Sequence, residues 1–216
     1  GTQNPSDQNS DSNQNDNSNS NTGSGTGNTV TLKKGDTFYS GNYRYRITKV
    51  SGKKGNVTVI GLKNKKTSTV SLPNTVKKNG YTFTVTAVGT KAFKNNTHIK
   101  KVTTNKALRT IGDDAFYLCA SIRTLSIPKG VKTIGKAAFA RCTSLTKVTI
   151  PTTVRTIKSK AFYGNKKLKT VRIYSAVIKT AGSKCFGGIS SKAVIKVPAK
   201  KVTAYKKLLK VKNVRK

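Results

Sequence analysis

The chain has 216 residues and carries 43 Lys and Arg against six Asp, which gives a formal net charge of +37. Charge of this sign and size favours polyanionic partners, and the scarcity of carboxylates speaks against general acid and base catalysis. Only one histidine is present and no C-x-x-C motif occurs, so a zinc site also lacks ligands. The composition therefore predicts no enzyme, no cofactor and no metal site.

Residues 1–28 consist of Asn, Ser, Gln, Asp, Gly and Thr with one Pro. Such a segment has too little apolar surface to fold, so we expect a disordered linker. It would serve as a tether that holds the folded part away from a membrane or wall anchor, or be a tail without a role. No signal peptide and no apolar run of about 20 residues is found. All cations follow the linker, so the remaining chain has a net charge of +40.

Residues 29–72 are expected to form a β-rich N-terminal cap. Two strands, joined by a loop at residues 51–56, are predicted at Tyr43–Val50 and Val57–Leu62. In the first strand Tyr43, Tyr45 and Ile47 alternate with two arginines. The apolar face therefore packs inward and covers the open end of the repeats that follow.

An Ala-Phe pair then recurs every 23 residues, with Cys185-Phe186 following after 24. The four pairs are Ala92-Phe93, Ala115-Phe116, Ala138-Phe139 and Ala161-Phe162. Apolar residues follow each Phe at fixed offsets, as in Leu145, Val148 and Ile150, and predict a short strand. A second apolar pair, as in Val131 and Ile134, predicts another extended segment. Each coil should thus have two strands and one corner anchored by Phe.

The combined pattern L-x-x-V-x-I-P-x-x-V-x-x-I-G-x-x-A-F-x-x-C resembles the BspA-like leucine-rich repeats of bacterial cell-surface proteins. The resemblance implies a mostly β leucine-rich repeat solenoid with short corners and helical turns. Repeats would fill residues 73–197, and residues 198–216 would form a C-terminal capping helix and tail. The family also implies a surface-exposed binding or adhesion protein, without specifying a ligand.

Outward positions of the predicted strands form a candidate binding surface, because neighbouring coils would align their cations and hydroxyls about 4.8 Å apart. We call this surface the strand face. The alternative is that Lys and Thr are here as ordinary solvent-facing strand residues. The cations of the strand face are Lys100, Lys101, Arg123, Lys147, Lys169 and Arg172.

Cys119 and Cys142 occupy the same slot in successive repeats, three residues after the Phe. The flanking repeats have Asn96 and Asn165 there, which favours a tight inward position and buried thiols. A disulfide between the two cysteines is geometrically possible at strand spacing. Cys185 replaces Ala before the last Phe and is expected to fill the core.

Two adjacent carboxylates and the single histidine are the remaining candidates for chemistry. Asp113 and Asp114 lie in one corner, where adjacent side chains point apart, so capping or solvent exposure is expected rather than a catalytic pair. His98 stands where sibling repeats have Ser and nothing nearby orients it as a base. No catalytic residue is predicted.

The C-terminal part should complete the fold. A last strand is predicted at Ala193–Val197, followed by a short amphipathic helix within Lys200–Lys210. The helix would pack on the final repeat, and its basic side could also contact an anionic membrane.

Together these patterns favour an exported, non-enzymatic protein of a bacterial cell surface, tethered by its linker and expected to be a monomer. Its partner would be a host or bacterial surface protein, or an anionic glycan or teichoic acid, bound by the strand face. The competing hypotheses are a nucleic-acid-binding basic protein, with non-specific binding, and a structural spacer of the cell envelope.

Overall fold

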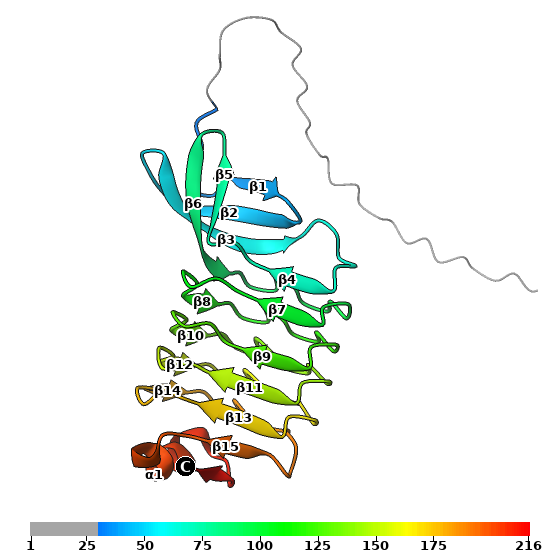
Figure 1. Ribbon diagram of the computed structural model, residues 1–216, viewed down its shortest axis with the longest axis vertical. Helices are drawn as coiled ribbons and strands as arrows, with labels where there is room; N and C mark the ends of the chain where they lie inside the picture. The colour runs from blue at the N-terminus through cyan, green and yellow to red at the C-terminus, as the bar shows by residue number, and fades with distance from the viewer. Residues whose placement is uncertain (1–29) are drawn as a thin grey trace, which may run out of the picture. The chain divides into compact units, whose positions relative to one another are not determined.

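The computed structural model describes residues 30–216, and the predicted linker at residues 1–28 lies outside them. The coils after the cap contribute two-residue strands to one parallel ladder and strands of three or four residues to another (Figure 1). We call the first the smaller ladder and the second the larger ladder, after the length of their strands. The predicted mostly β leucine-rich repeat fold is confirmed, with one short helix near the C-terminus.

The N-terminal cap is mainly antiparallel. Strands β1 (Thr37–Ser40), β2 (Tyr43–Ser51) and β3 (Lys54–Leu62) form a meander, and β5 (Thr75–Lys78) pairs with β6 (Tyr81–Val88) as a hairpin. The predicted loop at 51–56 is wrong, because both strands extend into it and leave a tight turn at Gly52, where φ is 55°. The predicted alternation in β2 is confirmed: Tyr45 and Ile47 are buried, Tyr43 is half-buried and both arginines are exposed.

The smaller ladder joins the cap to the repeats. β3 pairs in parallel with β6, and β6 pairs in parallel with β8 (Thr110–Ile111). The series continues through β10 (Thr133–Ile134), β12 (Thr156–Ile157) and β14 (Thr180–Ala181), all in register. The cap thereby supplies the first strand of this ladder and covers what would otherwise be an open edge.

The larger ladder forms the neighbouring side of each coil. Strands β9 (Thr124–Ser126), β11 (Lys147–Ile150), β13 (Thr170–Ile173) and β15 (Val194–Lys196) pair in parallel. Ahead of them, β4 (Thr69–Ser71) and β7 (Lys101–Thr103) form a separate pair. Two strands per coil were predicted, and both are present.

The corners between the ladders are held by a stack of five phenylalanine rings. Successive centroids lie 4.9 to 5.5 Å apart, and the last three ring pairs are nearly parallel. Every ring is buried, so each coil packs its anchor against the coils on both sides. The five rings belong to Phe93, Phe116, Phe139, Phe162 and Phe186.

The C-terminal segment closes the other end. A 3-10 turn at Ala199–Lys201 leads into α1 (Val202–Leu209), which buries Tyr205 and Leu209 as the predicted helix required. The prediction that β15 is the last strand is wrong. The chain returns as β16 (Val214–Arg215), which pairs in parallel with β15 and covers its edge.

Candidate functional site

All six predicted cations of the strand face are exposed. Register places Lys147 between Thr124 and Thr170 of the adjoining strands. One row further along, Arg172 lies between Thr149 and Lys196. The sheet therefore presents cations and hydroxyls together over the coils of β9 to β15.

The structure does not place all six cations on one ladder. Lys101 is the first residue of β7, which pairs with β4, and Lys100 lies just before it. The backbone amides of both residues donate to the carbonyl of Ser68. Arg123, Lys147, Lys169 and Arg172 belong to the coils of the continuous ladder that starts at β9. The first pair thus extends the strand face toward the cap, across a break in the hydrogen-bonded ladder.

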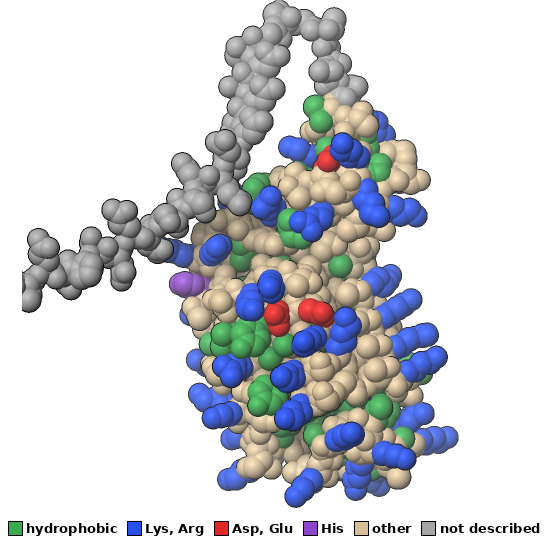
Figure 2. All heavy atoms as spheres, turned by 180° about the vertical axis from the view of Figure 1, so that it is seen from behind, with side chains coloured by type: hydrophobic (Ala, Val, Ile, Leu, Met, Phe, Trp, Pro, Cys, Tyr) green, Lys and Arg blue, Asp and Glu red, His purple; other side chains and the backbone are tan. Residues whose placement is uncertain are grey.

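Carboxylates are absent from the strand face. The described acidic residues are Asp36 in the cap and Asp113 and Asp114 at a corner. The two described salt bridges lie at corners, with Lys94 at 3.4 Å from Asp114 and Lys158 at 3.3 Å from Asp113. Figure 2 shows the molecule from behind, where Lys and Arg side chains are spread over the surface and acidic side chains occupy only small patches.

A second row of cations runs along the smaller ladder and was not predicted. One exposed Lys or Arg precedes the strand Thr of each of four successive coils. The amide of each of the last three cations donates to the carbonyl of the cation before it at 2.8 to 2.9 Å. A repeated Lys-Thr or Arg-Thr dipeptide was the signal that could have revealed it. The first member is already engaged, since the Arg109 guanidinium donates to the carbonyls of Lys106 and Leu108. The row consists of Arg109, Lys132, Arg155 and Lys179.

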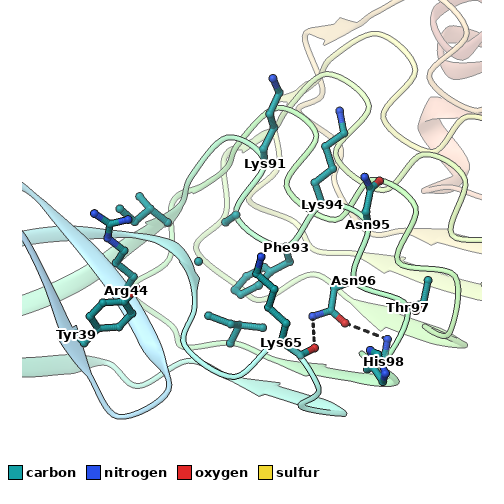
Figure 3. Close-up of a pocket in the computed structure, with 14 residues that line it drawn as sticks. Tyr39, Arg44, Lys65, Lys91, Phe93, Lys94, Asn95, Asn96, Thr97 and His98 are labelled. Atoms are coloured by element: carbon teal, nitrogen blue, oxygen red, sulfur yellow. Dashed lines mark hydrogen bonds between the residues drawn. The ribbon is translucent and has the colours of Figure 1, made fainter. Parts of the chain in front are cut away.

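A groove of about 720 Å³ lies where the cap meets the first coil (Figure 3). Tyr39 and Arg44 come from β1 and β2, Lys65 comes from the loop after β3, and Lys91 and Lys94 come from the first corner. Because these segments are separated in sequence by tens of residues, no local pattern predicted the groove. His98 is exposed and lies at the border of this groove.

The cysteine slot holds buried, unpaired thiols, which is the favoured of the two predictions. The Cys119 thiol donates to the Phe93 carbonyl at 3.1 Å, and the Cys142 thiol donates to the Phe116 carbonyl at 3.2 Å. Burial raises the pKa of both thiols, that of Cys119 to about 12. Burial also raises the pKa of Cys185 to about 11. All three groups are therefore protonated and structural at neutral pH.

The adjacent carboxylates do not form a pair. The Asp113 carboxylate accepts the Lys136 amide of the next coil at 2.8 Å, so it caps a corner, while Asp114 faces Lys94. Within residues 30–216, no three His, Cys, Asp or Glu side chains come together as metal ligands. The same residues include no helix that is long and apolar enough to cross a bilayer.

The stacked coils, their two parallel ladders and the phenylalanine corners define a leucine-rich repeat protein. The chain belongs to the family of the BspA type leucine rich repeat region, which matches residues 62–193 in six copies. Proteins of this repeat class are in general binding modules rather than enzymes.

Solved structures share the fold. A leucine-rich repeat protein from Bacteroides ovatus is 26% identical, with a TM-score of 0.55 over 75% of this chain and 47% of that one. The pneumococcal vaccine antigen PcpA is 20% identical, with a TM-score of 0.62 over 77% and 51%. A T. pallidum leucine rich repeat protein is 23% identical, with a TM-score of 0.57 over 72% and 81%.

The chain spans 47% and 51% of the first two proteins, so about half of each has no counterpart here. Among curated proteins, none is significantly similar to this chain in sequence.

Proposed function

We propose that the protein is exported, lies at a bacterial cell surface and binds an anionic polymer, or a protein with an acidic face, through its strand face. The observation that carries this proposal is the exposure of all six predicted cations beside strand hydroxyls, on a surface without carboxylates. Membership of the BspA type family supports the surface location. The fold shared with a pneumococcal vaccine antigen is consistent with it.

The geometry suits a repeating ligand. Parallel strands set successive coils about 4.8 Å apart. Charged groups along a linear polymer can therefore meet a cation on each coil or on every second coil. Thr and Ser hydroxyls between the cations can donate to the same phosphate, sulfate or carboxylate oxygens. Because the backbone of the ladder is fixed by hydrogen bonds, the surface is organised before a ligand binds.

The test is a comparison of two triple variants with equal loss of charge. Lys101, Lys147 and Arg172 are changed to Gln on the strand face, and Lys132, Arg155 and Lys179 are changed to Gln on the smaller ladder. Each variant loses two Lys and one Arg from exposed positions. Binding to wall teichoic acid, heparin, an acidic matrix protein and duplex DNA is measured across a salt series.

We expect the strand-face variant to bind one of these partners at least tenfold more weakly near physiological salt, and the smaller-ladder variant to change little. Equal losses in both variants, with a common salt slope, would mean that net charge alone attracts polyanions. If DNA were the only partner that stays bound at high salt, the result would favour the competing hypothesis of a nucleic-acid-binding protein. Either result would overturn the proposal.

A further inference from the structure

The groove between the cap and the first coil is separate from the strand face and is fixed by side-chain amides. Asn42, in the turn after β1, accepts the Asn64 amide at 2.6 Å and donates to the Asn64 carbonyl at 3.4 Å. From the other side, Asn96 donates to the Lys65 carbonyl at 2.8 Å, as the dashed line in Figure 3 marks. The loop after β3 is therefore tied to both walls of the groove, and its shape exists without a ligand.

The groove is lined by cations and contains no carboxylate. Arg44, Lys65, Lys91 and Lys94 line it from three segments, and none of its lining residues is Asp or Glu. Lys94 is partly neutralised by Asp114 at 3.4 Å. Within the described part of the chain, the other three cations have no salt-bridge partner. A volume of about 720 Å³ lies in the range typical of sites for small ligands.

An exposed aromatic ring gives the groove a second kind of recognition. Tyr39 is 52% exposed, although the preceding Phe38 is buried in the cap. The Arg44 guanidinium lies 5.9 Å from the centre of the Tyr39 ring. A half-exposed ring next to a cation suits the apolar face of a sugar that carries a charged substituent. Asn95 and Thr97 are exposed at the other side of the groove and can bond sugar hydroxyls.

We propose that this groove binds an acidic oligosaccharide, with sugar rings on Tyr39 and their sulfate or carboxylate groups at Arg44, Lys65 and Lys91. Single-stranded nucleic acid fits less well, because its recognition stacks successive bases on several aromatic side chains. In this groove Tyr39 is the one exposed aromatic residue, since Phe93 is buried. The site is independent of the strand face and would hold whether or not that surface binds a polymer.

The test uses the full chain and a sulfated heparin hexasaccharide, with uncharged maltohexaose and a DNA hexamer as comparison ligands. In the groove variant, Arg44, Lys65 and Lys91 are changed to Gln. Its matched control is the Lys132, Arg155 and Lys179 variant, which loses the same two Lys and one Arg. Tyr39→Ala removes the ring without a change of charge, and Tyr39→Phe retains the ring. All of these positions are exposed, so circular dichroism should show unchanged folding.

By calorimetric titration at physiological salt, the groove variant should bind the hexasaccharide at least tenfold more weakly and the matched control less than threefold more weakly. Tyr39→Ala should weaken binding severalfold, and Tyr39→Phe should bind like the unmodified protein. Equal weakening by groove variant and control would overturn the proposal. So would no measurable binding of the hexasaccharide, or tighter, Tyr39-dependent binding of the DNA hexamer.

Discussion

At the residue scale, three successive coils share one hydrogen bond, rather than one residue type, in the slot three residues after the corner Phe. Cys119 and Cys142 each donate to the Phe carbonyl of the preceding coil, and Asn165 donates to the Phe139 carbonyl at 3.0 Å. Asn165 also donates to the Phe162 carbonyl at 2.9 Å. Its Oδ1 atom is buried without a partner among the described residues. A cysteine thiol supplies the donor for the Phe carbonyl of the preceding coil, and unlike Asn it brings no strong acceptor that would itself need a donor.

This equivalence predicts that Asn165→Cys is tolerated. It retains the donor and removes the unpaired oxygen at the cost of one hydrogen bond, so the free energy of unfolding should change by less than about 1 kcal/mol. Asn165→Leu leaves two buried carbonyls without a donor and should lower the free energy of unfolding by about 2 kcal/mol. Urea unfolding of both variants checks this. Equal destabilisation would show that the slot requires the carboxamide itself.

The buried thiols should make stability depend on alkaline pH. Burial raises the pKa of Cys119 from 9.0 to about 12, although a backbone hydrogen bond partly opposes the shift. Above pH 9 the unfolded chain loses the thiol proton while the folded chain keeps it. The stabilisation is therefore complete below pH 9 and is lost as pH rises toward 12. At pH 10 the loss is on the order of 1 kcal/mol.

Cys119→Ala lacks this dependence and is the reference. Between pH 8 and pH 10, the difference in free energy of unfolding between unmodified protein and variant should shrink by an amount on the order of 1 kcal/mol. All other titrating groups occur in both proteins and cancel in the difference. A difference that stays constant up to pH 10 would mean that the folded thiol ionises normally.

At the element scale, the parts that the sequence predicted are those with a local, repeated pattern. Two strands per coil followed from apolar residues at fixed offsets after each Phe, and α1 followed from an apolar stripe at helical spacing. β16 was missed because Val214–Arg215 is too short to show a period. It is a strand only because β15 offers an unpaired edge beside it. Pairing between distant segments decides such elements, and no local window contains that information.

The terminal helix is attached to the last coils through a tyrosine hydroxyl. Tyr205 donates to the Ser175 carbonyl at 3.0 Å and accepts the Ile178 amide at 3.1 Å, and all three groups are buried. Tyr205→Phe leaves both backbone groups unpaired while it keeps the ring. The free energy of unfolding should fall by about 2 kcal/mol.

Hydrogen exchange locates the effect of this change. The Ile178 amide should exchange faster in Tyr205→Phe, whereas amides of the central coils, such as Ile134, should lose protection only as far as global stability falls. Lys206→Gln, at an exposed position of the same helix, is the control and should leave both unchanged. An unaltered Ile178 amide would show that apolar packing alone holds the helix.

At the scale of the whole molecule, the two candidate surfaces differed in how far the sequence could reveal them. The strand face was predictable because alternation within one strand decides which side chains point outward, and the repeat aligns them. The groove depends on Tyr39, Lys65 and Lys91 meeting across three segments. That meeting follows from the pairing of β3 with β6 within the cap and of β6 with β8 of the first coil, which composition and periodicity do not encode.

The net charge of the folded part should make salt act in opposite directions on folding and on binding. With 43 cations and three aspartates, like charges repel within the folded coils, and salt screens them over a distance that falls from about 10 Å at 0.1 M to about 3 Å at 1 M. Sodium chloride should therefore raise the free energy of unfolding by about 1 kcal/mol over this range, or Tm by about 2–4 °C.

The triple Gln variants supply the control, because each has three cations fewer and should show a smaller salt-dependent rise in Tm. Polyanion affinity should fall over the same range. A Tm that is unchanged or falls with sodium chloride would mean that the cations are spaced widely enough for solvent alone to screen them. In that case repulsion within the fold is negligible. The cationic surface would then not lower the free energy of unfolding, and binding of a polyanion would not raise it by neutralising repulsion.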